Sequence, residues 1–142
     1  MHNSPQAVPG PAGRFFLSVA AGLLAPFTAL IVLALLLGGV VPPADLLIRL
    51  LPLTVLLALL AAAPWLVLAH ESVLTRWFVS LFIPVGMTFC ASAFLNLIGS
   101  PGHDQWFILG NLIWALVTST SCAACAQHLT ELADNPDNPS QT

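Results

Sequence analysis

The chain has 142 residues, of which 58% are hydrophobic and only 6% are charged, and its formal net charge is −3. A soluble domain carries about 25% charged residues, so the charged side chains of this sequence cannot cover a soluble surface. The composition therefore excludes a soluble fold and predicts an integral membrane protein of one domain, whose main partner is the lipid bilayer.

Nucleic acid is not an expected partner, because the chain has only three basic residues. Arg14, Arg49 and Arg76 are spread along the sequence, whereas binding to nucleic acid needs several cations on one face. The same scarcity excludes a polybasic lipid-binding cluster. The cysteines are three in number and lie in apolar segments, which argues against the disulfide framework of a secreted domain.

Four apolar runs are each long enough to cross a bilayer core of roughly 30 Å, which takes about 20 helical residues. The runs cover residues 15–41, 46–69, 77–99 and 106–127. The breaks between them are short, so the sequence predicts an all-α bundle of four transmembrane helices.

The predicted membrane domain covers residues 14–128. The first run is well over 20 residues long, whereas the apolar region of a signal peptide has about 7–15, so we expect a retained helix. Residues 1–13 and the acidic tail 129–142 contain no apolar run, and we expect both segments to be disordered.

Charged residues and prolines mark the start of the second run. Asp45 follows two prolines and is the expected N-cap of the second helix. Arg49 lies four residues later, where Asp45 would be its ionic partner and where the side chain can snorkel to the interface. Prolines also lie inside three of the runs, and tolerated kinks are favoured over the broken helices of a transporter. These prolines are Pro26, Pro52, Pro64 and Pro84.

The distribution of arginines predicts the orientation. Arg14 and Arg76 fall on the side of the two termini and Arg49 falls on the other side, so the positive-inside rule favours cytoplasmic termini. The small size and the abundance of Leu and Ala suggest a bacterial inner membrane.

No Asp, Glu, Lys or Arg lies in the middle of a run, so the sequence predicts neither a catalytic site nor a cofactor. The pairs His70–Glu71 and His103–Asp104 lie in the breaks between runs, where we expect solvated side chains.

Neutral polar and small residues form one stripe on each of the last two helices. On the third helix they recur every four residues, at Thr88, Ser92 and Asn96. On the fourth they follow spacings of 4, 3, 4 and 3, at Asn111, Ala115, Thr118, Cys122 and Cys125. Such stripes favour helix packing in membranes. The alternative is the lining of a pathway formed by several copies of the chain.

The Cys122–Cys125 pair is the candidate metal site. Two thiolates at this spacing can bind one soft metal ion. His128 lies about 9 Å further along the axis than Cys122, so it cannot join them on a straight helix, and Cys90 or a partner would have to supply a third ligand. Redox activity is disfavoured, because the C-terminal end of a helix opposes a thiolate. We expect a packing role, with metal binding as the alternative.

These observations predict a non-enzymatic accessory, assembly or immunity-type subunit that acts through a protein partner or as a homo-oligomer. The first alternative is an oligomeric channel or small-solute transporter lined by the third and fourth helices. The second is a soft-metal handler that uses Cys122 and Cys125.

Overall fold

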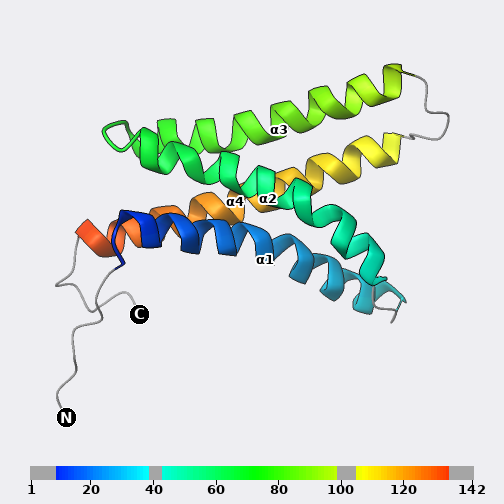
Figure 1. Cartoon of the computed structure of the whole chain (residues 1–142), viewed down its shortest axis with the longest axis horizontal. Helices are drawn as coiled ribbons and strands as arrows, with labels where there is room; N and C mark the ends of the chain where they lie inside the picture. The colour runs from blue at the N-terminus through cyan, green and yellow to red at the C-terminus, as the bar shows by residue number, and fades with distance from the viewer. Residues whose placement is uncertain (1–8, 39–42, 99–104, 135–142) are drawn as a thin grey trace, which may run out of the picture.

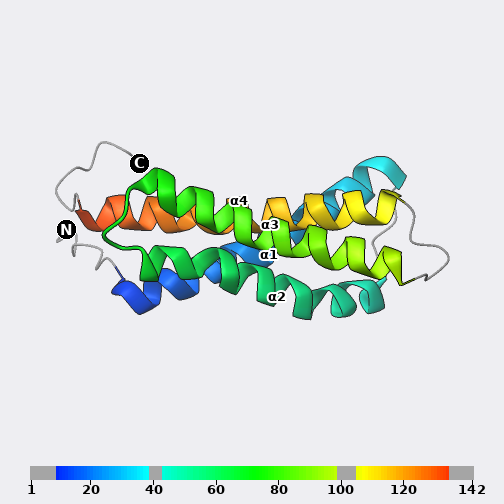
Figure 2. The same ribbon diagram turned by 90° about the horizontal axis from the view of Figure 1, so that it is seen from above.

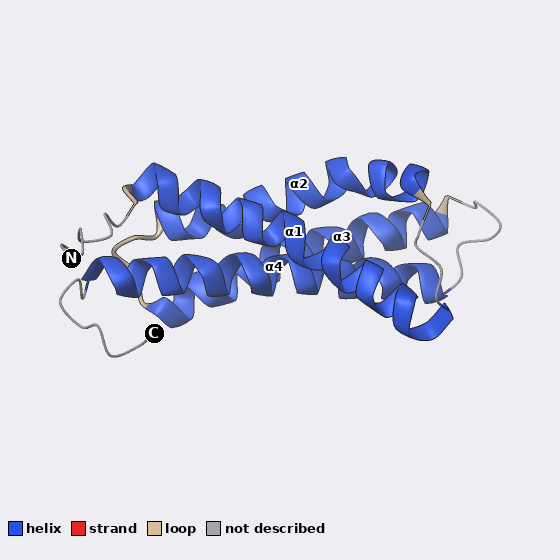
Figure 3. Ribbon diagram, turned by 90° about the horizontal axis from the view of Figure 1, so that it is seen from below, coloured by secondary structure: helices blue, strands red, loops and turns tan. Residues whose placement is uncertain are grey.

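The computed structural model describes residues 9–38, 43–98 and 105–134, and it confirms the all-α membrane fold. The four helices are α1 (Pro11–Gly38), α2 (Ala44–Val67), α3 (Val73–Leu97) and α4 (Gln105–Asp134). Each helix is long and apolar enough to cross a membrane. Helices make up nearly all of the described ranges, and no strand occurs in them (Figure 3).

The outer ends of the bundle differ from the predicted boundaries. α1 begins at Pro11 rather than at Phe15, with proline in the first helical position, where its missing N–H has no cost. α4 continues to Asp134, so the first part of the predicted tail is helical. There the Nε2 of Gln127 donates to the Oε1 of Glu131, one turn further on, at 2.6 Å. A helix can therefore continue past the point where its apolar run stops.

α2 and α4 form the centre of the bundle, and α1 and α3 lie on opposite sides of this pair. Figure 1 shows α3 along the upper edge and α1 along the lower edge. Within the described residues, α1 and α3 each pack against α2 and α4 but not against each other. The start of α1, the end of α4 and the α2–α3 turn lie together in Figures 1 and 2. We call this end of the molecule the terminal end.

The interior is built from small residues. Among the buried hydrophobic residues that the structure describes, Val19 and Leu57 are the only large aliphatic ones, and the others are alanines and Cys122. Large side chains point outward instead, such as Leu36 and Leu97, which are 78% and 84% exposed. This arrangement suits a bilayer, because lipid tails solvate large apolar side chains and small residues let helix backbones approach closely.

The closest approach of three helices occurs at Gly22 of α1. An added Cβ at Gly22 would lie 3.1 Å from the Cβ of Cys122, 3.2 Å from the Cβ of Ala58 and 3.3 Å from the carbonyl oxygen of Thr118. Two of these neighbours are on α4 and one is on α2. A larger residue at Gly22 would therefore push α1 away from both central helices.

The four prolines do not break the helices. α1, α2 and α3 are continuous through Pro26, Pro52, Pro64 and Pro84, so the prediction of tolerated prolines is confirmed. Pro52 is exposed and the other three are buried.

Arg76 of α3 closes the turn between α2 and α3. Its Nε donates to the carbonyl oxygens of Leu68 at 2.9 Å and Glu71 at 3.1 Å, and its Nη2 donates to that of Ala69. These carbonyls lie just beyond the last residue of α2, where partners within the helix are no longer available, and the guanidinium gives them donors from the same chain. The carbonyl oxygen of Leu68 also accepts from the backbone N–H of Glu71 at 2.9 Å. The guanidinium also lies over the ring of Trp65, 5.6 Å from its centroid.

The start of α2 corrects one expectation. Its N-cap is Pro43, which provides no side-chain hydrogen bond, and Asp45 is an exposed residue of the first turn. The helix begins two residues earlier than predicted, so Asp45 is too far along the helix to cap it, although its charge still suits the positive end of the helix dipole. The expected ion pair between Asp45 and Arg49 stays a prediction. Arg49 is exposed.

Candidate functional site

Three of the polar side chains predicted to share a face on α3 and α4 are buried within the single chain, and Asn111 is half-buried. Thr88, Ser92 and Thr118 are at most 6% exposed. The Oγ1 of Thr88 donates to the carbonyl oxygen of Pro84, and that of Thr118 donates to the carbonyl oxygen of Trp114, both at 2.8 Å. Each of these threonine hydroxyls therefore bonds within its own helix, which removes most of the cost of placing it in an apolar interior.

One contact joins the two predicted stripes. The Nδ2 of Asn111 donates to the Oγ of Ser92 at 3.4 Å, a long hydrogen bond between α4 and α3. The side chain of Asn96 lies outside the described part of the structure. The backbone carbonyl oxygen of Thr118, by contrast, borders Gly22 of α1. The α4 stripe therefore contacts α3 near its start and α1 and α2 further along.

Cys122 and Cys125 lie in different surroundings. Cys122 is fully buried, and its Sγ donates to the carbonyl oxygen of Ala58 at 3.5 Å. It belongs to the core formed by α1, α2 and α4, whereas Cys125 is half-buried and Cys90 is exposed on α3. Within the described residues, no group of three His, Cys, Asp or Glu side chains lies close enough to hold a metal ion. Metal binding by the pair stays a prediction, and the surroundings of Cys122 are those of a packing residue.

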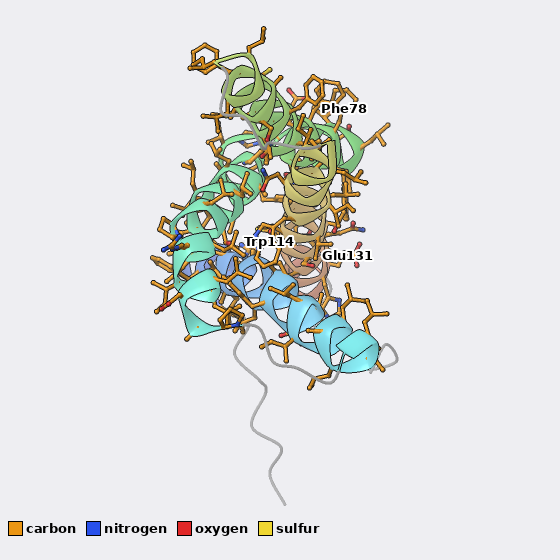
Figure 4. The ribbon with its side chains drawn as sticks, turned by 90° about the vertical axis from the view of Figure 1, so that its right-hand side faces the viewer. Phe78, Trp114 and Glu131 are labelled. Carbon is orange, nitrogen blue, oxygen red and sulfur yellow. The ribbon has the colours of Figure 1, made fainter. Side chains whose placement is uncertain are left out.

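A polar contact in the interior was missed by the sequence analysis. The Nε1 of Trp114 donates to the Oγ1 of the fully buried Thr54 at 2.9 Å, which links α4 to α2. Phe27 of α1 packs edge-to-face on Trp114, with ring centroids 5.2 Å apart. Figure 4 shows Trp114 among the helices, with Phe78 on the outside of α3. The available signal was a tryptophan in the middle of the fourth span, away from the interfaces where tryptophans gather.

An apolar groove opens on the outer surface between α3 and α4. Its volume is about 380 Å³. The lining includes Leu81, Phe82, Gly86 and Phe89 of α3 and Leu112 and Leu116 of α4. No atom lies within 4 Å of the position that a Cβ at Gly86 would occupy. Phe78 and Phe82 stack beside the groove, with centroids 4.8 Å apart. We call this feature the α3/α4 groove.

Of the two ionisable pairs in the breaks, the structure describes only His70–Glu71. His70 and Glu71 are both exposed in the α2–α3 turn, and His103 and Asp104 lie outside the described residues. Comparison of the chain with protein-family models, curated proteins and solved structures finds no match. A proposal for function therefore has to rest on the geometry of the bundle.

Proposed function

We propose that this small multi-pass membrane protein is a non-enzymatic accessory, assembly or immunity-type subunit, and that it binds a transmembrane helix of a partner protein. The observation that carries the proposal is the α3/α4 groove. The groove is wholly apolar along its lining, and it lies on a surface that the chain's own helices leave open. A partner of matching chemistry is an apolar helix within the same bilayer.

The residues on α3 suit the approach of another helix. Gly86 has open space beside it, and Cys90 lies one turn further on with its side chain exposed. Two small residues four positions apart let a second backbone come close, and van der Waals packing is the main attraction between helices in lipid. The rings of Phe82 and Phe89 form walls on which the side chains of a partner helix can pack.

The alternatives have less support. A pathway built from several copies would need polar side chains on an outer face, whereas Thr88, Ser92 and Thr118 are buried in a single chain. A metal site at Cys122 and Cys125 would need further ligands. For location, we propose a bacterial inner membrane with cytoplasmic termini, supported by Arg14 and Arg76 at the terminal end and Arg49 outside it.

The test is a pull-down of the full tagged chain from membranes in a mild detergent, with quantitative mass spectrometry of what co-purifies. Gly86→Leu fills the groove, and Gly110→Leu is the matched control, because Gly110 also has open space beside it but does not line the groove. We expect one membrane protein in near-stoichiometric amount with the parent and the control, and at least about a tenfold loss with Gly86→Leu, equivalent to ~1.4 kcal/mol.

Two results would contradict the proposal. The first is a partner that binds Gly86→Leu as well as it binds the parent. The second is a parent that purifies with no stoichiometric protein and forms a defined homo-oligomer by native mass, which would favour the channel alternative.

A further inference from the structure

A pocket at the terminal end brings together two arginines that are far apart in the sequence. Arg14 of α1 and Arg76 of α3 both line it, together with Trp65 of α2 and Asp134 of α4. The pocket has a volume of about 310 Å³. Its charged groups are two guanidiniums and one carboxylate, so the lining carries a net positive charge.

Two buried donors in this lining have no acceptor. The Nε of Arg14 and the Nε1 of Trp65 are both buried, and neither has a hydrogen-bond partner among the described residues. Buried N–H groups are nearly always paired, because leaving one unpaired costs free energy, and more so when the group is charged. The two donors come from different helices, α1 and α2, and both residues line the same pocket.

Arg76 contributes mainly charge. Its Nε and Nη2 are used by the carbonyls at the end of α2, which fixes the guanidinium beside the pocket. Asp134 lines the same pocket and offsets part of the charge of the two arginines, which leaves the lining with one net positive charge. The pocket therefore has a positive charge from Arg76, whose guanidinium is fixed by its hydrogen bonds, and an unpaired guanidinium nitrogen from Arg14.

The rest of the lining is apolar and includes Phe15, Ala62 and Leu66. The pocket thus combines cationic donors with a hydrocarbon surface, at an end of the bundle that carries two tryptophans, Trp65 and Trp77. Tryptophans at helix ends are typical of the interface between lipid and water. Basic pockets between transmembrane helices at this depth suit the headgroups of acidic lipids.

We infer that this pocket binds a phosphate group, supplied by a lipid headgroup or by free phosphate. Phosphate oxygens accept from a guanidinium in a forked geometry, and a further oxygen of the same group can accept from the indole N–H of Trp65. The apolar lining would contact the glycerol and the first acyl carbons of a lipid, which free phosphate lacks.

The test uses the full chain, freed of lipid in a neutral detergent, and native mass spectrometry to measure dissociation constants. The probes are phosphatidylglycerol, phosphatidylcholine and inorganic phosphate. The variants are Arg14→Gln, which removes one cationic donor, and Trp65→Phe, which removes the indole N–H but keeps a ring under Arg76. Arg49→Gln is the matched control, because it removes an arginine that does not line the pocket.

We expect phosphatidylglycerol to bind the parent more tightly than phosphatidylcholine. Arg14→Gln should weaken this binding about tenfold, Trp65→Phe about threefold, and Arg49→Gln less than about twofold. Thermal unfolding of each variant checks that it is folded. If Arg14→Gln does not fold, the binding measured for Trp65→Phe tests the inference.

If inorganic phosphate binds with the same dependence on Arg14 while the two lipids do not differ, the source is free phosphate. Equal binding of the probes to the parent, Arg14→Gln and Trp65→Phe, or no binding of any probe, would overturn the inference. These variants leave the α3/α4 groove unchanged. The proposal of partner binding can therefore fail or succeed independently of the inference of phosphate binding.

Discussion

Gly22 of α1 and Cys122 of α4 are far apart in the sequence, yet a Cβ added at Gly22 would lie 3.1 Å from the Cβ of Cys122. A methyl group there would lie closer to Cys122, and to Ala58 of α2, than ordinary van der Waals contact allows, so these neighbours would have to shift by a few tenths of an ångström. This point fixes how closely α1 docks on the central pair, and the first two predictions concern it.

Gly22→Ala should destabilise the protein by about 1–3 kcal/mol, because an added methyl group overpacks the junction of three helices. Gly110→Ala is the control, since open space surrounds that position and alanine favours a helix over glycine by about 1 kcal/mol. Unfolding with SDS, followed by circular dichroism, measures both. Equal stability of the two variants would contradict the close approach.

Replacing both Cys122 and Cys125 with alanine should leave the protein folded and able to bind its partner, because alanine keeps the small volume of the junction. Cys122→Leu should destabilise it by about 1–3 kcal/mol through overpacking. The same unfolding assay and a pull-down test these outcomes. The metal interpretation would gain support if the folded double variant lost activity and the parent purified with near one equivalent of copper, zinc or mercury.

Trp114→Phe should lower stability by roughly 0.6 kcal/mol, and at most about 1.7 kcal/mol, the range for hydrogen bonds between membrane helices. The phenyl ring can still pack on Phe27, and the change removes the donor of the 2.9 Å bond to Thr54 together with part of the ring volume. A double-mutant cycle with Thr54→Val measures the coupling directly. Additive effects of the two substitutions would show that the bond contributes nothing to stability.

Arg76→Lys should destabilise the α2–α3 turn although the charge is retained. A lysine ammonium cannot reproduce the planar set of donors to the carbonyls of Leu68, Ala69 and Glu71. The expected loss is about 1–3 kcal/mol in the unfolding assay. Arg49→Lys is the contrasting case, since Arg49 is exposed and a lysine can snorkel as well. Similar losses in both variants would argue against the capping role of Arg76.

Reporter fusions test the orientation. Asp45 at the start of α2 and Glu71 in the α2–α3 turn lie at opposite ends of a helix long enough to span the membrane. With cytoplasmic termini, alkaline phosphatase should be active when fused after Asp45 and inactive when fused after Glu71. The reverse pattern would place the terminal end outside the cytoplasm.

The number and approximate extent of the helices follow from the sequence, because run length and a low content of charge are local properties. Which helices pack against one another does not follow from the sequence. The spacing on α4 marks Asn111 and Thr118 as one stripe, but only the bundle shows that Asn111 contacts α3 and that Thr118 borders α1. A periodic pattern identifies a face of a helix without identifying its neighbour.

The joining of Arg14 and Arg76 in one pocket was also beyond the sequence analysis, which treated them as separate charges. Their proximity depends on how the ends of α1 and α3 are arranged around α2 and α4. The end of α4 was placed too early for a different reason. Apolar runs report membrane depth, whereas the helix continues beyond the apolar run to Asp134, the last described residue.

The internal hydrogen bonds of the buried hydroxyls bear on how the protein is made. Ser18 donates to the carbonyl oxygen of Arg14, Thr54 to that of Leu50, and Thr118 to that of Trp114. Each helix can therefore enter the bilayer with these hydroxyls satisfied before its neighbours exist. α1 leaves the ribosome first, but Cys122, which it contacts on α4, is synthesised only after α2 and α3. The first helix can therefore stay inserted in the lipid without its partners. The bundle can pack completely only after the fourth helix has been inserted.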